Sequence, residues 1–149
     1  MDDSPALLRP LIGLVAFDAK KGHGSFVTFS LTTRPESPTE DFFFWIYMCN
    51  WWIRTSDREL AHCESSDDEI ASAVSALNGW KLNEIVLHSN LTLEGLFHGA
   101  SLIFGNGLTM KLCQYEDSPP DDAIFMTRNA AKDWVSYYSD GSIRSDATA

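Results

Sequence analysis

The feature that most constrains the fold is an aromatic run at residues 42–54, which holds three of the five tryptophans of the chain. Aromatic and β-branched residues favour an extended strand. Successive side chains of a strand point to opposite faces, and here both faces are apolar. We therefore predict a central strand, covered on one side by the protein's own core and on the other by a helix, a second sheet or a partner protein.

The length of the run predicts that this strand is not straight. At about 3.3 Å per residue it would extend for about 43 Å, whereas a domain of 149 residues is only about 38 Å across. We expect a bend or bulge near Asn50, the polar interruption, that places Trp51 and Trp52 in different layers. Most of the run should be core, so Trp45→Ala or Tyr47→Ala should cost about 3–5 kcal/mol.

Composition bounds the class of protein and the kind of partner. The 149 residues fit a single domain over 1–149, with an ordered core at about 11–143 and flexible ends. Twenty-one acidic residues against 11 basic residues give a net charge of −10. This charge argues against binding to nucleic acid or to an anionic membrane surface. It favours a partner with a basic surface, although acidity also serves solubility alone.

Cysteine usage and the first residues predict a cytoplasmic protein. Three cysteines, an odd number without close spacing, suit reduced thiols in the cytosol. The chain opens with acidic residues where a signal peptide would be basic. The apolar stretch at 11–17 is too short for a membrane span, which needs about 20 residues.

The remaining patterns predict an α+β fold, a mostly antiparallel twisted sheet of hairpins and a meander with one main amphipathic helix. The helix is expected at 66–78, because Ser66 and Glu69 form a capping box ahead of an apolar stripe, and Gly79 ends it. We expect it to cover one face of the aromatic strand. The tail from residue 145 should fray. Further strands are expected at 11–17, 25–32, 59–63, 81–88, 91–97, 101–104, 108–113, 123–127 and 134–138.

No motif predicts a chemical reaction. The four histidines are not paired at helical spacing, and the spacings that mark a metal site are absent. The Gly-His-Gly-Ser segment at 22–25 fits a tight hairpin turn better than a nucleophile elbow. Cys49 lies among apolar residues, which raise the pKa of a thiol and make it unreactive. We predict no enzyme activity, no catalytic residue, no metal and no cofactor.

Three segments resemble a group of small bacterial proteins: LIG at 11–13, GHGSF at 22–26 and WIYMCNW at 45–51. The resemblance covers about residues 11–143 and includes a central helix and a Leu-rich meander. Proteins of this build are similar to the immunity proteins of polymorphic toxin systems. The shared motifs are structural, so the resemblance implies the fold more firmly than an activity. The sequence departs from the pattern at Trp51-Trp52 and at 91–104, so no partner-binding residue is carried over.

The leading hypothesis is an immunity-type protein that neutralises a cognate bacterial toxin domain by direct binding. Carboxylates would meet a basic toxin surface, and an aromatic side chain that the bend leaves exposed would anchor the interface. The candidate contacts are the carboxylates of one acidic loop and two adjacent tryptophans: Glu116, Asp117, Asp121, Asp122, Trp51 and Trp52.

Two alternatives stay open. One is a small-molecule-binding module or weak enzyme with an aromatic-lined pocket, in which His23 or His88 would be the polar participant. The other is a subunit of a larger assembly, with Trp51 and Trp52 buried in a homodimer. A monomer at micromolar concentration would remove the second alternative.

Overall fold

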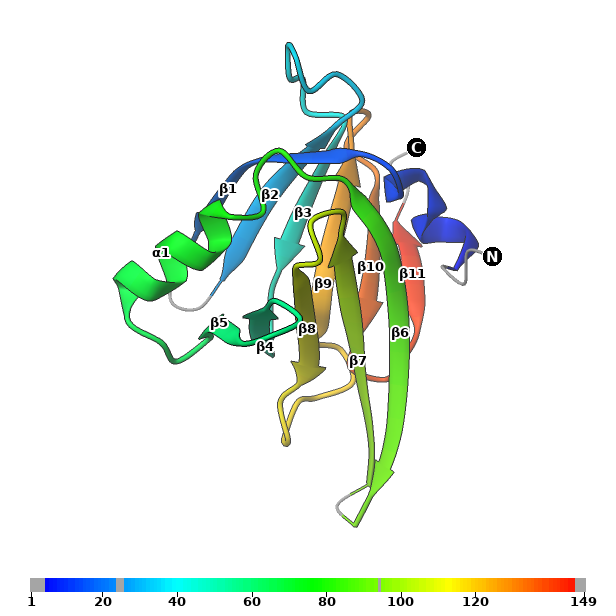
Figure 1. Ribbon diagram of the computed structural model, residues 1–149. Coiled ribbons are helices and arrows are strands. Elements are labelled where there is room, and N and C mark those ends of the chain that lie inside the picture. The colour runs from blue at the N-terminus through cyan, green and yellow to red at the C-terminus, as the bar shows by residue number, and fades with distance from the viewer. Residues whose placement is uncertain (1–4, 24–25, 94, 147–149) are drawn as a thin grey trace.

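The protein is an α+β fold in which two antiparallel sheets pack face to face beside one main helix (Figure 1). This computed structural model describes residues 5–23, 26–93 and 95–146. The predicted fold class is confirmed. Sheet A has six strands in the order β1-β2-β3-β9-β10-β11, and sheet B has five in the order β5-β4-β8-β7-β6.

The elements follow one another along the chain as a series of hairpins interrupted by the helix. In chain order they are η1 (Ala6–Leu11), β1 (Val15–Lys21), β2 (Val27–Thr32), β3 (Phe42–Ile46), β4 (Cys49–Arg54), β5 (Glu59–His62), α1 (Asp67–Ser75), β6 (Leu82–Thr92), β7 (Gly95–Phe104), β8 (Thr109–Gln114), β9 (Ala123–Asn129), β10 (Trp134–Tyr138) and β11 (Ile143–Asp146). In the described part of the chain, no helix has the length and apolar character that crossing a bilayer requires.

The aromatic run is divided between the two sheets: its first part is β3 in sheet A and its second part is β4 in sheet B. The chain crosses over at Tyr47 and Met48, whose N–H groups donate to the Ile124 and Ala123 carbonyls, each at 3.0 Å. The predicted bend is therefore present, but it lies ahead of Asn50, which is itself a regularly paired residue of β4.

The crossing changes which side chains of the run face the core. In β3 the buried side chains are Phe44 and Ile46, whereas in β4 they are Cys49, Trp51 and Ile53. Two residues rather than one separate Ile46 from Cys49, so the alternation shifts by one position. A strand without this crossing would bury the opposite set of side chains in its second half.

The core between the sheets is built on stacked aromatic rings. The Phe44 ring lies 4.8 Å from the Phe29 ring and 4.8 Å from the Phe125 ring, centroid to centroid. Residues from both sheets, from α1 and from η1 join the same cluster. Because Leu8 is fully buried in it, the core begins earlier than the predicted residue 11.

Trp45 and Tyr47 lie on the other side of the aromatic run and are only half-buried. They contact the Phe26 ring, with centroids 5.9 and 5.0 Å away. Their predicted burial in the core is wrong, because α1 packs mainly against β1 and β5 instead of over the aromatic strand. Sheet B covers the opposite face of β3, which carries the buried side chains of Phe44 and Ile46.

The helix begins as its sequence predicts and ends early. The Ser66 side chain accepts a hydrogen bond from the Glu69 N–H, and Glu69 reaches back to Ser66, so the capping box is confirmed. The helix ends at Ser75, ahead of the predicted 78. The chain then turns through Gly79, which has a φ of +86° and donates its N–H to the Ala16 carbonyl at 2.7 Å.

Three other predicted elements differ from the structure. The expected strand at 11–17 is replaced by η1 and a later start of β1, because Gly13 turns the chain with a φ of +89°. The expected break at 89–90 does not occur, and β6 and β7 form one long hairpin. Of the tail that was expected to fray from residue 145, Ser145 and Asp146 belong to β11, where Ser145 pairs with Val135, and 147–149 lie outside the described residues.

Candidate functional site

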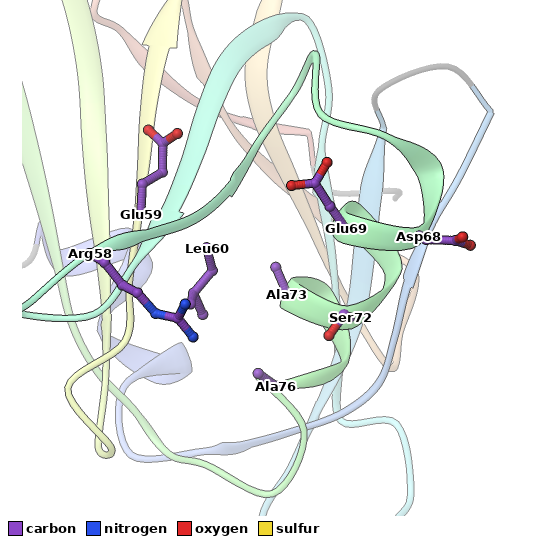
Figure 2. A pocket seen from close by; sticks show the side chains of 8 residues that line it. All are labelled: Arg58, Glu59, Leu60, Asp68, Glu69, Ser72, Ala73 and Ala76. Atoms are coloured by element: carbon purple, nitrogen blue, oxygen red, sulfur yellow. The ribbon is translucent and has the colours of Figure 1, made fainter.

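A hollow of about 590 Å³ lies between β5 and α1 (Figure 2). Figure 2 shows the Arg58 side chain extending from the β5 side and Asp68 pointing away from Leu60. Glu69 at its rim is engaged in the helix cap, where it accepts the Ser66 hydroxyl at 2.9 Å. The lining is of mixed charge with a small apolar part: Arg58, Glu59, Leu60, Asp68, Glu69, Ser72, Ala73 and Ala76.

A second surface lies on the side of sheet B that faces away from the core. After the crossing, the side chains of β4 that alternate with the buried ones are Asn50, Trp52 and Arg54, and Trp52 is half-buried. The neighbouring strand β8 places Lys111 opposite Trp52 and Cys113 opposite Asn50. We call this surface the Trp52 face and define it by Asn50, Trp52, Glu59, His62, Lys111 and Cys113.

Three adjoining hollows indent the Trp52 face, with volumes of about 360, 370 and 500 Å³. Trp52 and Glu59 line two of them, Asn50 lines two, and Cys113 lines two. Trp52 therefore stands between neighbouring depressions. Such an arrangement suits a large apolar side chain that inserts between the side chains of a partner.

Two thiols of this region, those of Cys49 and Cys113, have raised pKa values. Burial raises the pKa of Cys113, and the positive charge of Lys111 acts in the opposite direction. Burial, with smaller contributions from Cys63 and Cys113, raises the pKa of Cys49 well above its usual range, as predicted. Cys63 Sγ lies 3.5 Å from Asn50 Oδ1, as expected for a thiol that donates a hydrogen bond. These properties suit packing and not thiolate chemistry.

One serine–histidine contact lies on the outer side of sheet B. His88 Nε2 is 2.8 Å from Ser101 Oγ, and these residues belong to adjacent strands β6 and β7. In the described part of the chain, no carboxylate hydrogen bonds to the His88 ring, so the third group that orients the base of a triad is not seen. Among residues 5–23, 26–93 and 95–146, no group of three or more His, Cys, Asp or Glu side chains is placed to hold a metal ion.

The structure separates the two predicted tryptophan contacts. Trp51 is fully buried between the sheets, so its predicted contact with a partner is wrong and it is a core residue. Trp52 points the opposite way and is only half-buried. The physical reason is the alternation of adjacent side chains along β4. The candidate anchor is thus Trp52 alone.

The predicted carboxylates of the β8–β9 loop do not form one patch. Glu116 is exposed and lines a hollow of the Trp52 face together with Asn50 and Cys113. Asp117 is exposed in the same loop. Glu116 is therefore the loop carboxylate that borders the Trp52 face.

The last two predicted carboxylates belong to a different part of the surface. Asp121 pairs with Arg144 of β11 at 3.7 Å. Asp122 accepts both the N–H and the hydroxyl of Ser139 through its backbone carbonyl, at 2.9 and 3.0 Å. These contacts hold the loop against β11 and Ser139, and Asp122 takes part in them through its backbone and not through its carboxylate.

Sequence reasoning missed Glu59, Lys111 and Cys113 as members of the Trp52 face. Lys111 and Cys113 alternate with buried neighbours in β8, so their outward direction was available as a signal. Glu59 gave no such signal, because it lies opposite Arg54 only through a register shift between β4 and β5. Their convergence around Trp52 was not available, because it depends on the antiparallel pairing of β4 with β5 and β8.

No protein-family model, curated protein or solved structure matches the chain. The resemblance to immunity proteins therefore stays a prediction, and the function is argued from the surface itself.

Proposed function

We propose that this is an immunity-type protein that neutralises a bacterial toxin domain by binding it through the Trp52 face. The observation that carries the proposal is the half-buried Trp52 side chain, which lines two of three adjoining hollows on the outer side of sheet B. Tryptophan is enriched among the residues that dominate binding energy, and such residues cluster near the centre of an interface. The strands around Trp52 give the anchor a rigid support.

The charge around the Trp52 face supports a basic partner. Three exposed carboxylates line its hollows, those of Glu59, Glu64 and Glu116, and they outnumber the two cations Arg54 and Lys111. The whole chain carries a net charge of −10. Complementary charge raises the rate of association and disfavours wrong partners. In this role the protein acts by occupying the toxin surface.

A small-molecule-binding module is the second candidate. The hollow of about 370 Å³, which Trp52, Lys111 and Cys113 line, favours it because it falls within the usual size range of ligand sites. A ligand there would quench Trp52 fluorescence and raise the melting temperature in the absence of any protein partner.

Co-expression with the toxin domain encoded beside the gene tests the leading proposal. We expect the wild-type protein to restore growth, and Trp52→Ala to lose most of this protection. Trp134→Ala is the matched control, because Trp134 is also a half-buried strand tryptophan but lies on the outer side of sheet A, against Arg128. Growth that is unaffected by the wild-type protein would sink the proposal.

Charge reversal tests the electrostatic part separately. Glu116→Lys should weaken protection, and the weakening should fade at high salt, because screening reduces the steering of charged surfaces. Glu36→Lys makes the same change of charge at an exposed position in the β2–β3 loop, at the opposite end of the molecule (Figure 1). Equal effects of the two variants would show that only net charge matters and not the Trp52 face.

A further inference from the structure

The edge strand β6 is the longest strand of the molecule and is poorly protected against pairing. It has 11 residues and ends sheet B. Among the described residues, no backbone hydrogen bond joins 86–91 to any segment other than β7. Residues 85–92 contain no Lys, Arg, Asp, Glu or Pro. An edge of this kind presents backbone donors and acceptors to another strand.

The other edges of the two sheets are protected. The edge strand β1 carries a register irregularity after Phe17 and two lysines at its end, and its first residue Val15 already bridges to Lys81. The edge strands β5 and β11 have only 4 residues each. Short strands, charges and bulges are the usual devices that prevent edge-to-edge pairing. The lack of them on β6 sets this edge apart.

The end of the β6–β7 hairpin extends beyond the body of the molecule (Figure 1). The pairing of β7 with β8 begins at Gly99, so residues 89–93 and 95–97 form a ribbon of two strands. The ribbon leaves the body where the His98 ring lies against Gly141, at a point where a Cβ atom would collide with the ring. A two-stranded ribbon is at best marginally stable in water by itself.

The ribbon also exposes three leucines. Leu91, Leu93 and Leu96 are 83%, 104% and 52% exposed, and they are three of the five large apolar side chains that the described surface exposes. Leu91 and Leu96 are directly opposite one another in the hairpin. An exposed apolar cluster on a projecting element is typical of an interaction site.

We propose that β6 pairs antiparallel with β6 of a second copy of this chain, about a two-fold axis at Ser89. In this register Leu87 lies opposite Leu91 of the second copy, and His88 lies opposite Asn90 of the second copy. The two sheets B then join into one continuous sheet. The interface is isologous, as in most symmetric dimers.

The sequence of β6 favours a second copy as the occupant over a strand of another protein. With the axis at Ser89, the residues next to it match in kind, because Leu87 faces Leu91 and His88 faces Asn90. The next pair is Val86 with Thr92, two β-branched residues that favour a strand. The register also keeps Ile85, Leu87 and Leu91 on one face, which extends the apolar face of the sheet. The pairing stretch is uncharged, so two copies with a net charge of −10 each meet where repulsion is least.

Light scattering after size exclusion tests the proposal on the full chain. We expect a mass of twice 16.7 kDa at tens of micromolar, falling toward the monomer on dilution. Leu91→Lys should raise the dimer dissociation constant at least 10-fold without affecting folding, because Leu91 is exposed in the single chain. Trp80→Lys, at an exposed side chain of the segment bridged to β1, is the matched control and should keep the dimer.

A pair of double variants tests the register. His88→Glu with Asn90→Glu places like charges opposite one another across the axis and should abolish the dimer. His88→Lys with Asn90→Glu places opposite charges there and should keep it. A monomer at every concentration would overturn the proposal, as would a dimer that survives both Leu91→Lys and the like-charge pair. A monomer that forms a complex only with another protein's strand would overturn the proposal and assign the β6 edge to that partner. These outcomes are independent of the proposed binding of a toxin by the Trp52 face.

Discussion

The two sides of β4 show how neighbouring residues of one strand acquire different roles. Trp51 and Trp52 are adjacent and chemically identical, yet Trp51 is fully buried between the sheets and Trp52 is half-buried on the outer side. Residue type therefore does not decide burial here. The crossing at Tyr47 and Met48 decides it, because it sets which side of β4 faces sheet A.

Two cysteines of sheet B differ between its inner and outer sides in the same way as the two tryptophans. Cys49 is on the inner side of β4, where its Sγ lies 3.5 Å from the Ile124 carbonyl, and it is fully buried. Cys113 is on the outer side of β8 and is partly exposed. The inner side of sheet B thus holds the fold together, and the outer side is available for contact.

The largest expected effect is that of truncating the inner tryptophan. Trp51→Ala should lower the free energy of unfolding by about 3–5 kcal/mol, because it removes a buried indole and leaves a cavity. Urea unfolding measures this loss. A loss below about 1 kcal/mol would contradict the assignment of Trp51 to the core.

Alkaline pH should destabilise the protein because it ionises a tyrosine hydroxyl that is buried between the sheets. Tyr137 reaches across the core and donates its hydroxyl to the Gly99 carbonyl of sheet B at 3.1 Å. Burial raises the Tyr137 pKa from 10.0 to about 12. Above pH 10 the unfolded chain loses this proton while the folded chain keeps it, so stability is fully present below pH 10 and is lost as pH rises toward 12.

The size of this alkaline loss follows from the shift. A change of two pKa units corresponds to about 2–3 kcal/mol by pH 12, and Cys49 adds to it in the same direction because its pKa is also raised. Urea midpoints measured from pH 9 to 12 check this. A flat profile would contradict the burial of the Tyr137 hydroxyl.

Removing the Tyr137 hydroxyl should cost less than removing the Trp51 ring. Tyr137→Phe keeps the ring and loses one hydrogen bond, which should lower stability by about 1 kcal/mol near neutral pH. The same variant should also flatten part of the alkaline loss. If the loss above pH 10 is the same in the variant and the wild type, Tyr137 is not its source.

Thiol reactivity distinguishes the two sides of sheet B without changing the stability of the protein. With iodoacetamide at pH 8, Cys113 should be alkylated slowly while the protein is folded, because its partly exposed thiol can be reached although its pKa is raised. Cys49 should react only when the protein unfolds, because a fully buried and protonated thiol is inert. Mass spectrometry of digested samples locates the label. Labelling of Cys49 at the rate of Cys113 would show that the two sides are not separated in this way.

Local signals predicted the parts of the fold that depend on neighbours in sequence. The capping box at Ser66 and Glu69 placed the start of α1, and the turn between β7 and β8 was expected from its two glycines. It closes as expected, with the Phe104 N–H donating to the Leu108 carbonyl at 2.9 Å. Such features rest on interactions within a few residues, which the sequence displays directly.

Features that depend on distant pairing were not predictable in the same way. The crossing at Tyr47 and Met48 relies on hydrogen bonds to β9, far along the chain. The Trp52 face likewise needs β8 beside β4, which brings Cys113 next to Asn50. An aromatic run that is apolar on both faces carries no signal for where it changes sheet. The sequence therefore could not show which of Trp51 and Trp52 faces the core.

The central claim is that the outer side of sheet B binds the toxin domain and that the inner side stabilises the fold. The affinity of Trp52→Ala for the purified toxin domain tests this claim most directly. We predict a loss of about 2 kcal/mol or more, which is about 30-fold in the dissociation constant, with a stability change below about 1 kcal/mol and normal affinity for Trp134→Ala. An affinity of Trp52→Ala equal to that of the wild type would contradict the claim.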